Sequence, residues 1–269
     1  MNLHILKKTV IFSFIMGFAV IANSADYTDG DFKKMKAQSL KYKFKLGWFT
    51  LGGGMLHFEE NNLIVKNEPY HVVKAHAYTD GMAAFFTDMD DHYKSVINNR
   101  TLKPYLSEKH VTIKNGFWDQ WNSFDYNKKE ITVKAKRTKN GEKSDRAWTV
   151  KMTDDSYDIV SSFVYFMDVN WSQKHKGDTV MIMTHYDKKV YPVGVIYLGK
   201  ETIKYNDRKV NTYHTQIYLP ADKEYTVGRP VYAWLSTDGR NIPLVIQSKL
   251  AFGNATCELI ELDGKEPAF

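Results

Sequence analysis

Alternation of apolar and polar positions runs through most of the chain and is clearest in the segment Gly228–Glu261. Successive side chains of a strand point to opposite faces, so the apolar residues within Val231–Leu235 are expected to share one face. The pair Asp238-Gly239 is a strong hairpin signal. Proline cannot donate to a strand ladder, so Pro243 is expected to begin the return strand or to face an edge. The pattern predicts three consecutive antiparallel strands.

The same alternation recurs in shorter segments upstream, for example at Ser39–Lys45 and His71–Tyr78. Apolar residues with helical spacing stand out in Ser156–Trp171, where Asp155 or Ser156 is a suitable N-cap. Many strands at short spacing with so little helix predict an all-β fold. We expect a mainly antiparallel, curled sheet, either a β-roll or an open barrel, with one or two short helices.

The first residues have the pattern of a secretory signal peptide. Lys7 and Lys8 precede an apolar stretch over 9–22, and small residues follow. This predicts cleavage near Ser24 or Ala25; the alternative, a permanent anchor, needs about 20 apolar residues. No cysteine lies near the cut, so a lipoprotein is not expected. We predict a signal peptide over 1–25 and a single antiparallel β-rich domain over 26–269, periplasmic or secreted, with no transmembrane segment after cleavage.

Charge and cysteine content narrow the classes of partner and compartment. Loss of 1–25 removes Lys7 and Lys8 and no acidic residue, so the formal charge falls from +6 to +4. This mildly basic balance demands no polyanionic partner, and nucleic acid is not expected in an exported chain. Cys257 is the one cysteine of the sequence, so no internal disulfide can form, which favours the bacterial envelope. It is in phase with apolar neighbours, which predicts a buried thiol and not a nucleophile.

No cofactor is predicted. The run Gly52–Gly54 would need a helix after it to form a phosphate-binding loop. A strand follows instead, so a tight turn or a bulge is the expected structure.

Several segments, in this order and spacing, resemble a family of exported bacterial proteins, domain of unknown function 3108. The matching segments are Leu40–Phe44 with Gly54, His92–Ser95 with Leu102–Pro104, Asp158–Tyr165 with Lys176–Asp178, and Val231–Asp238 with Ile242-Pro243. Asn98 stands where the family more often has an acidic residue. The resemblance implies a spiral β-roll in the periplasm or envelope and brings no established catalytic residues.

The strongest metal-ligand candidate is the segment Asp88–His92. On a strand, Asp88, Asp90 and His92 would project from one face, and two carboxylates with an imidazole suit Zn²⁺. The alternative is a solvated loop that enters a strand, and without a second histidine motif no metal is predicted.

A second group of carboxylates lies at the start of the expected helix. Asp154, Asp155 and Asp158 could supply the acid and the base of a glycoside hydrolase. The alternative is that they cap free N–H groups and complement the helix dipole.

Aromatic and basic side chains provide the candidate ligand-binding residues. The run Phe117–Tyr126 could stack on sugar rings if exposed, or belong to the core if buried. The hairpin Lys128–Lys151 has nine Lys or Arg and one basic face. The candidate residues are Trp118, Trp121, Tyr126, Tyr165, Trp171, Trp234, Lys134 and Lys136.

Export, many aromatics and the lack of a coherent catalytic set favour a non-enzymatic binding or scaffold protein of the cell envelope. Its expected ligand is lipid-like or a glycan, held in an aromatic-lined concavity. The alternative is an envelope glycan hydrolase that uses the clustered carboxylates. A third hypothesis is interaction with another envelope protein through a strand edge near Pro243.

Overall fold

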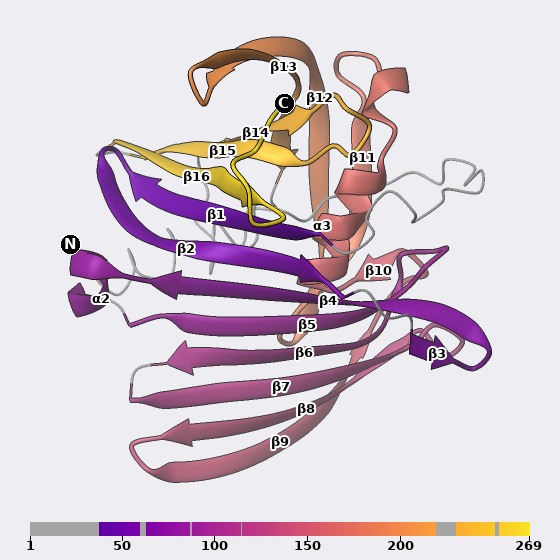
Figure 1. Ribbon diagram of the computed structural model, residues 1–269. Helices are drawn as coiled ribbons and strands as arrows, with labels where there is room; N and C mark the ends of the chain where they lie inside the picture. The colour runs from indigo at the N-terminus through magenta and orange to yellow at the C-terminus, as the bar shows by residue number, and fades with distance from the viewer. Residues whose placement is uncertain (1–37, 60–62, 87, 114, 219–229, 251–252) are drawn as a thin grey trace.

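The computed structural model describes residues 38–59, 63–86, 88–113, 115–218, 230–250 and 253–269. The predicted signal peptide lies outside the described residues. The described part of the chain forms one 16-stranded sheet (Figure 1). All of its strand pairs are antiparallel except β10 with β11, so the expected curled, mainly antiparallel fold is confirmed.

The first nine strands make up one half of the sheet. They are β1 (Ser39–Leu46), β2 (Phe49–Phe58), β3 (Leu63–Val65), β4 (Glu68–Thr79), β5 (Asp90–Asn98), β6 (Pro104–Ile113), β7 (Gly116–Asp125), β8 (Glu130–Lys139) and β9 (Glu142–Lys151).

The remaining strands are β10 (Ser156–Tyr157), β11 (Thr179–Tyr186), β12 (Lys189–Tyr205), β13 (Arg208–Tyr218), β14 (Val231–Ser236), β15 (Pro243–Leu250) and β16 (Gly253–Leu262). The helical elements are α2 (Gly81–Phe86), α3 (Ile159–Asp168) and the 3₁₀ turn η2 (Trp171–Gln173).

Strand order explains why the sheet forms a roll. The order is β10-β11-β12-β13-β14-β15-β16-β1-β2-β4-β5-β6-β7-β8-β9, with β3 on β4. The two end strands, β9 and β10, are consecutive in sequence. The short link from Lys151 to Ser156 can span at most about 17 Å. The sheet must therefore curl until its two ends lie near each other.

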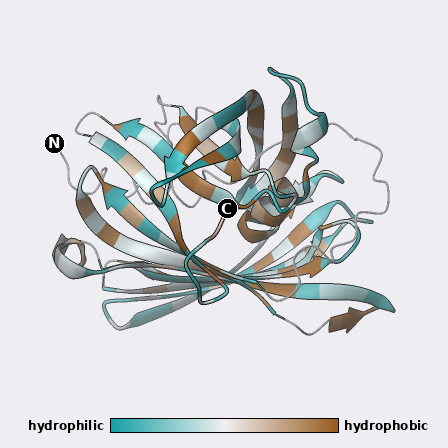
Figure 2. Ribbon diagram, turned by 45° about the horizontal axis from the view of Figure 1, so that its top comes forward, coloured by the Kyte–Doolittle hydropathy of each residue, from teal (hydrophilic) through white to brown (hydrophobic). Residues whose placement is uncertain are grey.

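The C-terminal meander agrees with the sequence pattern. Strands β14, β15 and β16 pair in succession, and β16 continues onto β1. Val231, Ala233 and Leu235 are all buried, and Pro243 begins β15. Figure 2 shows alternating apolar and polar bands along the strands, as expected when one face of each strand is buried.

The glycine run lies inside β2 and makes room for aromatic rings. A Cβ on Gly54 would stand 2.8 Å from a ring carbon of Phe44, and one on Gly53 would stand 2.8 Å from the Tyr78 hydroxyl. The register between β1 and β2 shifts beside this run, between Phe44 and Lys45. The expected bulge is therefore present, and close approach of rings explains the glycines.

Helix α3 fills the inside of the roll. It contacts β4, β5 and β11, and its apolar side chains Val160, Phe163, Val164 and Met167 belong to the main core. The helix is shorter than the sequence pattern indicates. It begins at Ile159, its N-cap is Asp158, and Ser156 instead forms β10. The expected caps, Asp155 or Ser156, were therefore wrong by two or three positions.

Both ends of α3 are bonded to the surrounding sheet. At the N-terminus, Asp158 accepts hydrogen bonds from the backbone N–H groups of Val160 and Ser161 and from the Ser95 hydroxyl of β5 at 2.5 Å. At the C-terminus, Asn241, between β14 and β15, donates to the carbonyls of Met167 and Val169, each at 2.8 Å. The helix thereby links two distant parts of the sheet.

We expect Asp158→Ala to lower the free energy of unfolding by roughly 2–4 kcal/mol, because it removes a cap and leaves a buried hydroxyl unpaired. Urea unfolding at neutral pH measures the loss. The matched control is Asp155→Ala, an exposed carboxylate that should change stability by less than about 0.5 kcal/mol. Equal losses in the two variants would contradict the role of Asp158.

Candidate functional site

Cross-strand register places three histidines in one row. His76 of β4 pairs with His92 of β5, and His92 pairs with His110 of β6. The row continues to Asp119 of β7 and Lys136 of β8. Directly paired residues of an antiparallel ladder share a face, so these side chains project together.

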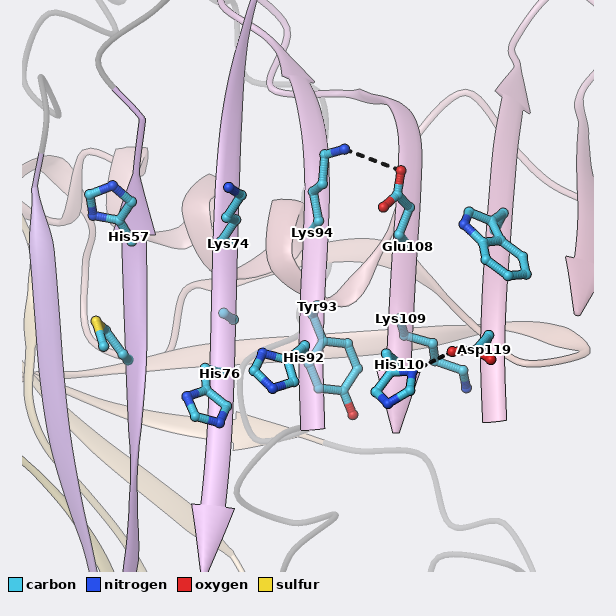
Figure 3. Close-up of a pocket in the computed structure, with 13 residues that line it drawn as sticks. His57, Lys74, His76, His92, Tyr93, Lys94, Glu108, Lys109, His110 and Asp119 are labelled. Carbon is cyan, nitrogen blue, oxygen red and sulfur yellow. Dashed lines mark hydrogen bonds and ion pairs between the residues drawn. The ribbon is translucent and has the colours of Figure 1, made fainter. Parts of the chain in front are cut away.

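The row lies on the outer face of the sheet. Ser95 points to the inner face, where it bonds Asp158 of α3. Side chains alternate along a strand, so Lys94, which is next to Ser95, points outward, and so does His92, which is two residues from Lys94. Figure 3 shows His76, His92 and His110 side by side on three neighbouring strands.

Two carboxylates bind the imidazoles of this row. Asp90 Oδ1 lies 2.6 Å from His76 Nε2 and 3.1 Å from His92 Nε2. The rings of His76 and His92 stack with centroids 4.1 Å apart and planes 7° apart. At the other end, His110 Nδ1 bonds Asp119. The hydrogen bond with His76 is the main cause that holds the pKa of the Asp90 carboxyl below its usual value.

A second row runs parallel to the histidines, one pleat away. It pairs Lys74, Lys94, Glu108, Trp121 and Lys134 across β4 to β8. Lys94 Nζ forms an ion pair with Glu108 at 3.2 Å, and the Trp121 side chain is 41% exposed. Aromatic and charged groups thus stand next to each other on adjacent strands.

The two rows line one open groove of about 490 Å³. Met55 and His57 of β2 bound it at one end, and Trp121 bounds it at the other. By contrast, two cavities on the helix side measure only about 20 and 30 Å³, room for about one water each. Of these three spaces between described residues, the groove on the outer face is the one with room for a ligand larger than a water molecule.

Only two of the three metal-ligand candidates lie close together in the structure. Asp90 and His92 lie on one face of β5, whereas Asp88 is exposed and precedes β5. The third member of the cluster is His76, whose donor atom lies within 4.8 Å of theirs. The sequence pattern did not single out His76 as a ligand candidate. The signal that could have found it is the β4–β5 hairpin, whose register pairs position 76 with position 92.

The aromatic candidates divide between the two faces. Trp171 is 1% exposed and donates to the carbonyl of Phe166. Tyr165 packs against Tyr157 in the core, and Tyr126 donates to the carbonyl of Ser156. Half-buried Trp118 donates to the Gln120 side chain on the inner face.

Trp234 lies outside the groove, on β14. Its ring stacks on His214 at 4.9 Å, and its indole N–H donates to Glu201 at 2.8 Å. Lys134 and Lys136 are exposed and stand opposite Trp121 and Asp119. Of the predicted ligand-binding residues, Trp121 therefore lines the groove, and Lys134 and Lys136 lie on the next strand, beside its lining.

The carboxylates proposed for hydrolysis do not converge on a cleft. Asp158 is buried as the helix cap, and burial raises the pKa of its carboxyl to about 6. Asp154 forms an ion pair with Lys129 at 3.1 Å, with both side chains exposed. Asp155 is exposed. Their positions agree with a capping role for Asp158 and a solvated surface for the other two.

A polar cluster lies inside the roll near Asp187. The buried Lys109 forms an ion pair with Asp187, and buried His185 bonds the Asp187 carbonyl at 3.1 Å. Trp148 of β9 donates to the same carbonyl at 3.3 Å. Burial lowers the pKa of His185 from 6.5 to about 4. These contacts join the β6–β9 half of the sheet to the turn between β11 and β12.

Comparisons with known proteins identify a family and a related fold. Residues 41–260 match the family "Protein of unknown function (DUF3108)". One similar solved structure is the "Beta-barrel-like Protein of Domain of Unknown Function DUF1849 from Brucella abortus", with a TM-score of 0.53 and 10% sequence identity. The alignment covers 85% of this chain and 98% of that one; at this identity it supports the fold alone. No curated protein gives a significant match.

Among the described residues, no helix combines the length and apolar character needed to cross a bilayer.

The buried His185 predicts an acid-dependent loss of stability. As pH falls from about 6.5 to about 4, the unfolded state takes up a proton that folded His185 resists, so stability falls across that window. Relative to His185→Gln, the native chain should lose roughly 2–3 kcal/mol of unfolding free energy between pH 7.5 and 4.5. Urea unfolding of both proteins measures the difference in their unfolding free energies at each pH. Carboxylates that both proteins share titrate in the same way, so their contribution cancels. A difference that does not vary with pH would contradict the burial of a neutral His185.

Proposed function

The chain belongs to the DUF3108 family of unknown function, and we propose that this member is an exported, non-enzymatic binding protein of the cell envelope whose ligand is an acidic glycan. One observation carries the proposal. Trp121, 41% exposed, lies at the end of the outer groove with charged side chains on the strands to either side.

An exposed indole supplies a flat apolar face on which a sugar ring can stack. Burial of such a face contributes affinity because it removes apolar area from water on both partners. Glu108 and Lys134 are the direct cross-strand neighbours of Trp121. Glu108 can accept hydrogen bonds from sugar hydroxyls, and Lys134 can donate hydrogen bonds to a sugar carboxylate. Ligand sites typically combine an aromatic surface with a few polar groups in this way.

The charge of the adjacent hairpin favours an acidic ligand. Lys134 and Lys136 of β8 are exposed, and among the described residues no carboxylate forms an ion pair with either. Unpaired cations beside the groove would attract carboxylate groups and raise their local concentration. Most residues that line the groove carry ionisable side chains, which can bond the hydroxyl and carboxylate groups of a glycan.

We expect short uronic-acid oligosaccharides to bind the purified protein more tightly than neutral oligosaccharides of the same length. Trp121→Ala and Lys134→Ala should each weaken this binding about tenfold, or about 1.4 kcal/mol. Isothermal titration calorimetry in buffer that contains EDTA measures the affinities. Higher salt should lower the affinity for the acidic oligosaccharides and leave the affinity for the neutral ones unchanged, because screening reduces ionic attraction.

The matched control is Trp48→Ala. Trp48 is 85% exposed and stands in the turn between β1 and β2, apart from the residues that line the groove. Its replacement should leave the affinity unchanged. Failure of every acidic oligosaccharide to bind, or an equal effect of Trp48→Ala and Trp121→Ala, would refute the proposal.

Export is supported by the residue pattern of 1–25 alone. If the segment is a signal peptide, the protein recovered from the envelope fraction of its bacterial host should begin near Ala25 or Asp26. Intact-mass measurement and N-terminal sequencing test this. A chain that retains Met1 in the membrane fraction would support the anchor instead.

A further inference from the structure

We propose that His76, Asp90 and His92 form a binding site for a divalent transition-metal ion, with Zn²⁺ as the expected occupant. His76 on β4 and His92 on β5 line the same groove as the glycan site, at least two strands away from Trp121 on β7. It does not depend on the proposed glycan-binding function.

Strand pairing brings the three ligands together. His76 and His92 are direct partners in the β4–β5 ladder. Asp90 lies two residues before His92 on β5, and its partner Tyr78 lies two residues after His76 on β4. Positions two apart on a strand share a face, so all three side chains project outward. The backbone ladder fixes these positions, so little ordering is needed before an ion binds.

The donor atoms already have nearly the spacing that an ion requires. All three lie within 4.8 Å of one another. Asp90 Oδ1 stands 2.6 Å from His76 Nε2 and 3.1 Å from His92 Nε2. Tetrahedral Zn²⁺ with bonds of about 2.0–2.1 Å separates neighbouring ligand atoms by about 3.3 Å. Small rotations of the stacked rings would reach that geometry.

The ligand types select the class of metal. Two imidazole nitrogens and one carboxylate oxygen suit Zn²⁺, Ni²⁺ and Cu²⁺, whereas Mg²⁺ and Ca²⁺ prefer oxygen ligands. Three protein ligands leave a fourth position open to water or to a ligand in the groove. The side chains are accessible to an ion, since His76, His92 and Asp90 are 31%, 52% and 62% exposed.

The competing interpretation is a carboxylate that two histidines share through hydrogen bonds alone. Both interpretations explain the short distances from Asp90 to the two imidazoles, but they predict different results when a metal ion is added. A metal would replace the protons on the two Nε2 atoms and bind in a defined ratio.

Calorimetric titration of the full chain, purified without a histidine tag and stripped with EDTA, tests the proposal. With ZnCl₂ alone as the titrant, we expect one ion per chain with micromolar or tighter affinity, and no heat from MgCl₂. His76→Gln, Asp90→Asn and His92→Gln should each weaken Zn²⁺ binding at least tenfold.

The matched control is His57→Gln. His57 is an exposed histidine that lines the same groove but lies outside the three-residue cluster, so its loss should leave affinity unchanged. Trp121→Ala should also retain Zn²⁺ binding, which separates this site from the glycan site. Substoichiometric binding, or variants at 76, 90 and 92 that bind as the native chain does, would overturn the proposal. Equal melting temperatures of all variants in EDTA would show that the substitutions do not act through folding.

Discussion

The anchoring of α3 at both of its ends is the constraint on which the rest of the structure depends. An open antiparallel sheet of this length has one apolar face and must curl around something to bury it. Here the filling is a single helix of ten residues. Asp158 bonds its first turn to β5, and Asn241 bonds its last turn to the link between β14 and β15. Since those strands lie far apart in the sheet order, the helix sets how tightly the two halves approach.

Because the interior of the roll is packed, the candidate ligand-binding groove lies on its outer face. The helix-side cavities of about 20 and 30 Å³ hold little more than a water each, and the large aromatic Trp171 is sealed in the core. Of these three spaces between described residues, the largest therefore lies outside the sheet and not in an aromatic-lined concavity inside it. The groove of about 490 Å³ is lined instead by outward residues of β2, β4, β5, β6 and β7. On such a face the ladder register arranges the side chains, so function can vary there without disturbing the core.

Two parallel rows on this face differ in chemistry although they share the same strands. One row has His76, His92 and His110, with Asp90 beside the first two histidines and Asp119 next to the third. The other has lysines, Glu108 and Trp121. The proposed metal site uses two histidines of the first row, and the proposed glycan site is centred on the second. Their separation by one pleat would let an ion and a glycan occupy the groove together, with the open metal position facing the same solvent-filled space.

The sequence by itself determined most of the strands, the C-terminal meander, the hairpin of β8 and β9, and the buried Cys257, because these depend on period-two alternation and on turn residues close in the chain. Tertiary structure decided the rest. The cap of α3 is Asp158, since that residue meets Ser95 of a strand 63 positions away. His76 joins Asp90 and His92 only through the β4–β5 register. Trp121 is exposed while Trp171 is sealed, because burial depends on which face of the sheet the helix covers. Local pattern cannot encode that choice, since it is made by contacts between residues distant in sequence.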